Sequence, residues 1–265
     1  MMTFGTANTV PFDDHFSFEH AGIVHSVFEK GRGPGVLLMH ELPGMTDEFW
    51  RLANWLSEHF TVYAPDLFGR ASNPTPANPG RNFFRACISR EIHLFANNDP
   101  GPITQWLRAL AKQLHERIGG PGVGVIGMCM TGNFALTLAL DPWVAAPVTS
   151  QPGLPASTPF RNQDGGLQMS DEEKSQFAAR EIDAMGLRFD GDSLCKAARF
   201  DAVRDLVGAD RFKEHVIDDE HRNPEGPLKH PHSVLTADLV DTDDSVTKGK
   251  LIEVIGFLNA RISSV

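Results

Sequence analysis

VGVIGMCMTGNFALTLAL, residues 123–140, joins an apolar run of strand character to an apolar run of helix character. Val123, Val125 and Ile126 are typical of a buried strand, and the run from Phe134 onward has the length and helix formers of a buried helix. Cys129 lies between the two runs, where small flanking residues permit a sharp turn. The sequence therefore predicts a cysteine on a tight strand-to-helix turn.

A cysteine at such a turn has two interpretations. The thiolate is the nucleophilic form, and the first amides of the following helix present partial positive charge to it. Burial in apolar surroundings acts in the opposite direction and keeps the thiol neutral. The alternative is that Cys129 is a small buried core residue, because free cysteine is among the most buried residue types.

Predicted strands and helices alternate along the rest of the chain. The expected strands are residues 36–40, 61–67, 123–127, 145–149, 186–190 and 212–217. The expected helices are residues 47–59, 102–118, 130–140, 171–184, 197–207 and 246–262. This order is typical of the α/β class, in which helices cover both faces of a mostly parallel sheet.

We expect one domain over residues 1–265, because a chain of 265 residues can bury a full core in a single unit. Residues 1–20 are expected to form a short N-terminal arm. Residues 71–80 and 151–166 are rich in loop-forming residues and read as insertions over one sheet.

The charge and cysteine content restrict the partners and the compartment. The net charge is −10 and basic residues are scattered, which argues against a nucleic-acid partner. Three separated cysteines, Cys87, Cys129 and Cys195, lack the CxxC spacing of zinc or redox pairs. No signal peptide and no apolar run of membrane-spanning length is found, so we expect a cytoplasmic protein without a membrane partner.

Polar residues follow several of the expected strands, at the sheet edge where α/β proteins place their chemistry. These are the segment 40–44, Asp66, Asp192 and His232. The chain order of nucleophile, acid and histidine is the one expected for a catalytic triad on this type of sheet, so Cys129, Asp192 and His232 could converge.

Three alternatives remain at these positions. Asp190 is the rival to Asp192, and His230 is the rival to His232 because two residues apart on an extended segment point to opposite sides. Glu41 could instead cap the helix that begins near Thr46. The nearby acidic stretch 218–221 lacks defined metal-ligand spacing, so we expect a charged loop and no metal site there.

Together these segments resemble the dienelactone hydrolase family, the cysteine-nucleophile branch of the α/β-hydrolase fold. The resemblance extends from about residue 22 to the last helix. It rests on HELPG at 40–44, APDLFGR at 64–70, GMCMTG at 127–132, FDGDSL at 189–194 and PHSVL at 231–235.

The resemblance implies a hydrolase of a small ester, lactone or thioester that works through a covalent acyl-enzyme. Cys129 would attack the carbonyl, His232 would carry the proton to the leaving oxygen, and Asp192 would orient the imidazole. No organic cofactor and no metal is implied. The expected partner is a small molecule.

Further roles follow from the same resemblance. The backbone N–H groups of Leu42 and Met130 would form the oxyanion hole. Glu41 would help to take the thiol proton when substrate binds, so that a reactive thiolate exists only when needed. Two residues depart from the family pattern, Thr131 in the turn and Thr236, which stands where the dienelactone enzymes carry an arginine.

A substrate carboxylate could still be bound by an arginine, because guanidinium groups hold carboxylates in a bidentate geometry. Arg70, Arg81, Arg85 and Arg90 are available, and Arg85 and Arg90 are the preferred candidates. A different function remains open for the whole set of residues. Cys129 could serve a ligand-binding or peroxide-sensing protein that performs no hydrolysis.

Overall fold

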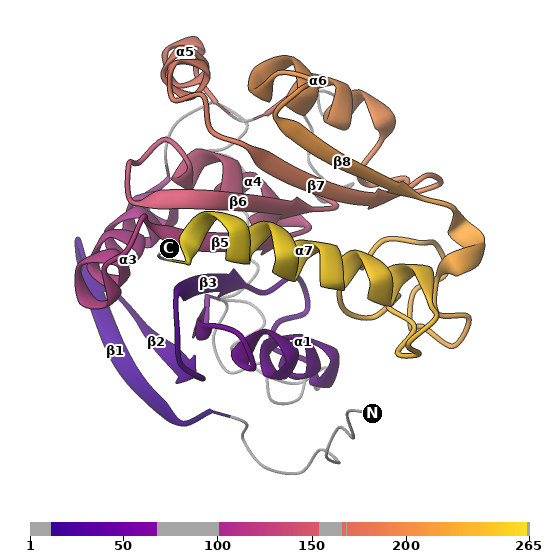
Figure 1. Ribbon diagram of the computed structural model, residues 1–265, viewed down its shortest axis with the longest axis horizontal. Helices are drawn as coiled ribbons and strands as arrows, with labels where there is room; N and C mark the ends of the chain where they lie inside the picture. The colour runs from indigo at the N-terminus through magenta and orange to yellow at the C-terminus, as the bar shows by residue number, and fades with distance from the viewer. Residues whose placement is uncertain (1–11, 68–100, 154–165, 168, 264–265) are drawn as a thin grey trace.

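The computed structural model describes residues 12–67, 101–153, 166–167 and 169–263. Its strands form one eight-stranded sheet in the order β1-β2-β4-β3-β5-β6-β7-β8 (Figure 1). The strands are β1 Asp14–His20, β2 Ile23–Lys30, β3 Gly35–Met39, β4 Thr61–Pro65, β5 Val123–Met128, β6 Val144–Ser150, β7 Ala184–Phe189 and β8 Phe212–Ile217. The helices are α1 Asp47–Ser57, α3 Pro102–Ile118, α4 Met130–Leu138, α5 Asp171–Ala179, α6 Ala197–Val207 and α7 Val246–Ile262, with a short 3₁₀ helix at Asp219–His221.

The six strands from β4 to β8 in the sheet order are parallel, and the pairs β1–β2 and β2–β4 are antiparallel. Parallel neighbours bring their carboxyl ends to one edge of the sheet. The segments that follow β3, β5, β6 and β7 therefore meet at the same edge, where ligands bind in open α/β sheets. This arrangement confirms the predicted α/β class, with a mostly parallel sheet and helices on both faces.

Two apolar cores lie on the two faces of the sheet. One contains side chains of α3, α4, α5 and α6, and the other contains side chains of α1 and α7. Figure 1 shows α7 crossing in front of the sheet, with α4 behind it. Successive side chains of β3 serve the two cores in turn: Leu37 and Met39 join the first, and Val36 and Leu38 join the second. A strand buried on both faces reads as a continuous apolar run, as in the sequence.

Local caps explain why several helix boundaries were predictable. Thr46 accepts the backbone N–H of Phe49 at the start of α1. Pro102 opens α3, where its missing N–H has no helical partner, and Gly119 ends α3 at φ 77°. The side-chain oxygen of Ser245, the N-cap residue of α7, accepts the backbone N–H of Lys248. The predicted bounds of α3, α6 and α7 agree with the structure.

Residues 1–20 were expected to form an N-terminal arm, and this prediction is wrong for residues 14–20. Residues 14–20 form β1, the edge strand of the sheet, which pairs along its length with β2. Ala21 and Gly22 connect the two strands with φ values of 51° and 78°, the positive values that a tight two-residue hairpin needs. The alternation of Phe16 and Phe18 with polar residues was the available signal for β1.

The region between α5 and β7 also differs from the prediction. The expected helix 171–184 ends at Ala179, and the expected strand 186–190 begins already at Ala184. Glu181 has φ 51°, a left-handed conformation that ends a helix. At the C-cap of α5, the guanidinium of Arg180 donates to backbone carbonyls within residues 139–144 and so holds the end of the helix against the α4–β6 connection.

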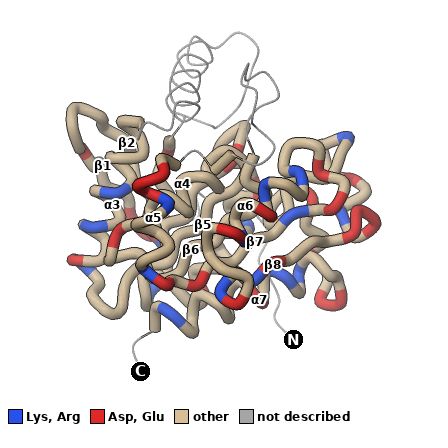
Figure 2. The backbone as a smooth tube through the Cα atoms, turned by 90° about the horizontal axis from the view of Figure 1, so that it is seen from above, with Lys and Arg blue, Asp and Glu red and all other residues tan. Residues whose placement is uncertain are grey.

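Acidic and basic residues are interspersed over the described chain (Figure 2). None of the helices in this part of the chain is long and apolar enough to cross a membrane. The predicted loop at 71–80 lies outside the described residues, as do positions 154–165 of the loop at 151–166. The division of the chain into a single domain stays a prediction.

Candidate active site

Cys129 occupies the turn between β5 and α4 with φ 53° and ψ −123°. A residue other than glycine rarely adopts this backbone conformation, and such strain is concentrated at functional sites. The Cys129 N–H donates to the carbonyl of Ser150 on β6 at 3.1 Å, and the Cys129 carbonyl accepts the N–H of Gly153 at 3.2 Å. The residue is 9% exposed, so its surroundings hold it at the sheet edge without sealing it completely.

Gly127 and Gly132 lie where the turn packs backbone closely against other segments of the chain. A Cβ atom on Gly127 would lie 2.1 Å from the carbonyl oxygen of Thr131. A Cβ atom on Gly132 would lie 3.0 Å from the Cα atom of Pro152. A contact of 2.1 Å forces the backbone to shift, so Gly127 is a steric requirement of the turn, whereas at Gly132 the neighbours would have to give by a few tenths of an ångström.

Thr131, which departs from the family pattern, fastens the turn instead of disturbing it. Its buried hydroxyl accepts the N–H of Met128 at 2.9 Å. The single hydroxyl proton has three carbonyl acceptors within 3.2 Å, those of Met128, Met39 and His40. The hydroxyl therefore ties the start of α4 to the carboxyl ends of β5 and β3.

Asp192 and His232 form a buried hydrogen-bonded pair at the same edge. Asp192 Oδ2 lies 2.7 Å from Nδ1 of His232, and both side chains are almost fully buried. The other oxygen, Oδ1, accepts the backbone N–H groups of Leu194 at 2.8 Å and Cys195 at 3.1 Å. These bonds fix the carboxylate so that it holds the imidazole in one orientation.

The two rival residues lie elsewhere. Asp190 is exposed and pairs with the guanidinium of Arg188 at 3.3 Å. His230 is exposed, whereas His232 is buried. The geometry therefore favours Asp192 and His232 over both alternatives.

The charge state of His232 depends on its neighbours. Burial alone would lower the pKa of the imidazole, but the Asp192 hydrogen bond and the interaction with Cys129 outweigh burial and raise the pKa above its ordinary value. Nε2 of His232 is buried. Because Nδ1 is bonded to Asp192, Nε2 is the nitrogen left to interact with Cys129. This nitrogen is available to a group that binds beside Cys129.

A second buried carboxylate, Asp238, supports the segment that carries His232. Asp238 Oδ2 accepts the backbone N–H groups of His232 at 2.9 Å and Ser233 at 3.0 Å. Its Oδ1 accepts from Nε of Arg222 at 3.0 Å. Asp238 follows His232 by six residues, and this proximity is the only signal in the sequence for its supporting role.

Glu41 follows β3 and is buried beside the same segment. Its carboxylate accepts from Gln151, Ser233 and Thr236. Burial raises the pKa of Glu41, and these hydrogen bonds and the charge of His232 oppose that shift. The alternative in which Glu41 caps α1 is wrong, because Thr46 provides that cap.

The two backbone N–H groups predicted to form an oxyanion hole directly follow Cys129 and Glu41 in the chain. Met130 is the first residue of α4, where a helix has no internal acceptor for the N–H group. Leu42 directly follows Glu41, and its N–H group has no acceptor among the described residues. Both N–H groups therefore have no helix or sheet partner among the described residues, and their role as oxyanion donors stays a prediction.

His40 is neutral and fastens the segment that leads to Glu41. The Glu41 carbonyl can only accept, so Nδ1 of His40 donates to it at 3.2 Å. The Leu67 N–H can only donate, so Nε2 accepts it at 3.1 Å. Burial, opposed by the bond to Glu41, lowers the pKa of His40 to about 4.

This lowered pKa predicts a loss of stability in acid. In the unfolded chain the histidine takes a proton near pH 6.5, whereas the folded protein resists protonation down to about pH 4. The contribution of His40 is therefore complete above pH 6.5 and is lost as the pH falls towards 4, by up to about 3 kcal/mol. Urea unfolding at pH 7 and pH 4.5 measures it. His40→Asn, which does not titrate, should lose correspondingly less stability over this interval, and an equal loss in both proteins would contradict the assignment.

The remaining predicted site residues lie outside the described part of the chain. This applies to Arg85 and Arg90, and to Arg70 and Arg81. Among the described residues there is no group of three or more histidine, cysteine or acidic side chains that could hold a metal ion.

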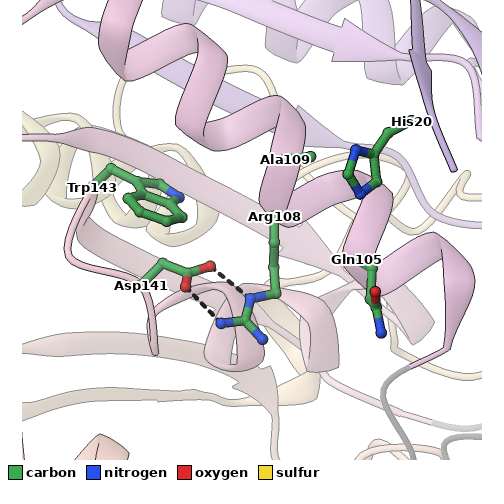
Figure 3. A pocket seen from close by; sticks show the side chains of 6 residues that line it. All are labelled: His20, Gln105, Arg108, Ala109, Asp141 and Trp143. Carbon is green, nitrogen blue, oxygen red and sulfur yellow. Dashed lines mark hydrogen bonds and ion pairs between the residues drawn. The ribbon is translucent and has the colours of Figure 1, made fainter.

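A surface pocket of about 370 Å³ lies apart from these residues (Figure 3). It is lined by His20, Gln105, Arg108, Ala109, Asp141 and Trp143. Arg108 donates to Asp141 through Nε at 2.7 Å and Nη2 at 2.6 Å. Asp141 precedes β6, at the end of that strand opposite to Gln151, so the ion pair joins α3 to the α4–β6 connection and contributes no group to the Cys129 site.

The fold and this edge geometry define a class of protein. The family model described as alpha/beta hydrolase fold matches residues 34–203, which include β3, the turn at Cys129 and Asp192. The chain belongs to the alpha/beta hydrolase fold family. A search of curated proteins gives no match.

Solved structures of this fold are similar over nearly the whole chain. A protein of Klebsiella pneumoniae subsp. pneumoniae MGH 78578, provisionally named a dienelactone hydrolase, is 14% identical with a TM-score of 0.53, covering 92% of this chain and 99% of its own. The meta-cleavage product hydrolase of Pseudomonas fluorescens IP01 is 14% identical with a TM-score of 0.56, covering 95% and 99%. The thioesterase domain from the curacin biosynthetic pathway is 11% identical with a TM-score of 0.55, covering 91% and 98%. At these identities the likeness shows the shared fold.

Proposed function

We propose that this protein is a dienelactone hydrolase-like enzyme that cleaves a small ester, lactone or thioester through an acyl-enzyme on Cys129. The observation that carries the proposal is the buried Asp192–His232 pair at the sheet edge where Cys129 occupies a strained turn. A nucleophile, a base and a group that orients the base are the parts that covalent acyl transfer requires.

The first half of the reaction forms the acyl-enzyme. The Cys129 thiol passes its proton to Nε2 of His232, and the sulfur attacks the substrate carbonyl carbon. The resulting oxyanion accepts hydrogen bonds from the N–H groups of Leu42 and Met130. The tetrahedral intermediate then expels the leaving oxygen or sulfur, which takes the proton from His232.

The second half returns the free enzyme. His232 removes a proton from a water molecule, which attacks the thioester carbonyl of the acyl-enzyme. The bond to Cys129 breaks, the sulfur regains a proton and the carboxylic acid product leaves. Asp192 keeps the imidazole in the tautomer that both halves need, because its carboxylate accepts a hydrogen bond from the Nδ1–H group.

Other parts of the proposal rest on the sequence. A substrate carboxylate would be bound by Arg85 or Arg90, and Glu41 would take part in ionising the thiol. The proposed partner is a small molecule, and the proposed location is the cytoplasm. The names of similar structures, a meta-cleavage product hydrolase and a thioesterase domain, are consistent with acyl chemistry on this fold.

A panel of lactones, aryl esters and thioesters tests the proposal. We expect turnover of at least one class, and the ranking by kcat/KM identifies the acyl group. Peroxide treatment of the same preparation tests the peroxide-sensing alternative. Selective oxidation of Cys129 without turnover of any member of the panel would contradict hydrolysis and favour that alternative.

A further inference from the structure

Glu41 accepts hydrogen bonds from three side chains at the site. Its Oε2 accepts from Nε2 of Gln151 at 3.1 Å and from Oγ of Ser233 at 3.0 Å. Its Oε1 accepts from Oγ1 of Thr236. Glu41 is only 8% exposed, so the three donors replace the water that this carboxylate loses on folding.

All three donors are uncharged, and they come from two different parts of the chain. Ser233 and Thr236 belong to the segment that carries His232, and Gln151 follows β6. Among charged groups, His232 acts on Glu41 through its charge. The guanidinium of Arg51 contacts the segment that carries Thr236, but its Nη2 donates to the backbone carbonyl of Thr236 at 2.9 Å and not to the Glu41 carboxylate.

Gln151 lies at the centre of this set. Its backbone N–H donates to the carbonyl of Leu187 on β7 at 2.6 Å, which fixes it at the sheet edge. Its side-chain Oε1 accepts the N–H of Val234 at 3.4 Å and the hydroxyl of Ser150. The φ of Gln151 is 35°, a left-handed value that favours glycine, so this side chain is held here at a cost in backbone strain.

One amide therefore connects two segments of the candidate site. Through Nε2, Gln151 holds the carboxylate that precedes Leu42. Through Oε1, it holds the segment that begins with His232. Thr236 makes the same connection from the other carboxylate oxygen. The separation of Glu41 from Gln151 is 110 residues and that from Thr236 is 195 residues, so these bonds exist only in the folded chain.

We propose that Gln151 and Thr236 are positioning residues that act through Glu41 to set the Leu42 N–H group at the correct place relative to His232. The proposal rests on the proposed function, because Leu42 matters only if an oxyanion forms beside Cys129. Oxyanion donors act through exact placement, so a shift of a fraction of an ångström reduces their effect.

Two reactions of Cys129 separate this role from thiol ionisation. Acylation by an aryl ester builds an oxyanion and needs the Leu42 N–H group. Alkylation by iodoacetamide builds no oxyanion and reports the reactivity of the thiol alone. A positioning role predicts that the first reaction slows while the second keeps its rate and its pH profile. If the Gln151 and Thr236 bonds instead served the separately proposed role of Glu41 in ionising the thiol, both reactions would change.

Thr236→Val is the main variant, because valine keeps the shape of threonine and removes the hydroxyl. We expect the acylation rate constant and kcat to fall about tenfold, with KM within about twofold of the wild-type value. Iodoacetamide alkylation should be unchanged from pH 6 to pH 9. Thr236→Ser retains the hydroxyl and should restore acylation. Gln151→Met, which removes the amide, should behave as Thr236→Val does.

The outcomes distinguish the two proposals. Wild-type protein that is not acylated contradicts the proposed function. Normal acylation in both the wild type and Thr236→Val overturns the positioning role alone, as does a parallel loss of alkylation. If Thr236→Val does not fold, Ser233→Ala removes a donor from the other oxygen of Glu41 and is judged by the same two reactions.

Discussion

Cys129→Ala is expected to abolish hydrolysis, with kcat/KM lower by at least about 10⁴-fold. The variant removes the atom that would form the acyl bond, and neither water nor His232 replaces a covalent nucleophile efficiently. Alanine fits the same turn, because the side chain becomes only smaller and the φ of 53° is already that of a residue with a Cβ atom. Steady-state rates with the preferred substrate of the panel measure the effect.

Cys195→Ala is the matched control. Cys195 is the other cysteine in the described part of the chain, and it is fully buried in the core on the α4 side of the sheet. Burial raises the pKa of its thiol, which keeps the sulfur unreactive. Its contact with Asp192 uses the backbone N–H group, which alanine retains. Loss of activity in Cys195→Ala together with full activity in Cys129→Ala would refute the choice of nucleophile.

Asp192→Asn is expected to lower kcat about 10³-fold or more while the fold is retained. The N–H groups of Leu194 and Cys195 require an oxygen where Oδ1 now lies. The asparagine carbonyl must therefore face these two groups, and its NH₂ group must face His232. An NH₂ group can only donate to Nδ1, which places the imidazole proton on Nε2. Nε2 then cannot accept the proton of Cys129.

Asp190→Asn provides the comparison for this variant. Asp190 lies two positions away, and its side chain is 70% exposed while its partner Arg188 is buried. Asp190 makes no bond to His232, whose partner is Asp192, so this variant should keep nearly the wild-type kcat. Equal losses in the two variants would show that the effect arises from charge near the site and not from the Asp192–His232 bond.

Much of the architecture follows from local sequence. Continuous apolar runs identify β3 and β5 because strands buried on both faces have no alternation. Gly127 and Gly132 mark the turn because a side chain at either position would meet backbone atoms. The β1–β2 hairpin was missed because β1 is largely exposed and β2 is only partly buried, so the alternation of apolar and polar residues is weak in both strands.

The candidate site was predictable only in part. Cys129, Asp192 and His232 follow strands or sit in recognisable segments, so their type and order pointed to them. Gln151 and Asp238 gave no such signal, because their contacts depend on segments brought together by the sheet. Local sequence places the groups proposed to react, whereas long-range packing supplies the groups that hold them.

Mass spectrometry of the protein during turnover of an activated ester tests the central claim most directly. The acyl-enzyme should appear as one added acyl mass, peptide mapping should place it on Cys129, and it should disappear when the substrate is exhausted. Cys129→Ala should acquire no such mass. Turnover that proceeds with an unmodified Cys129, or with the acyl group on another residue, would contradict the account.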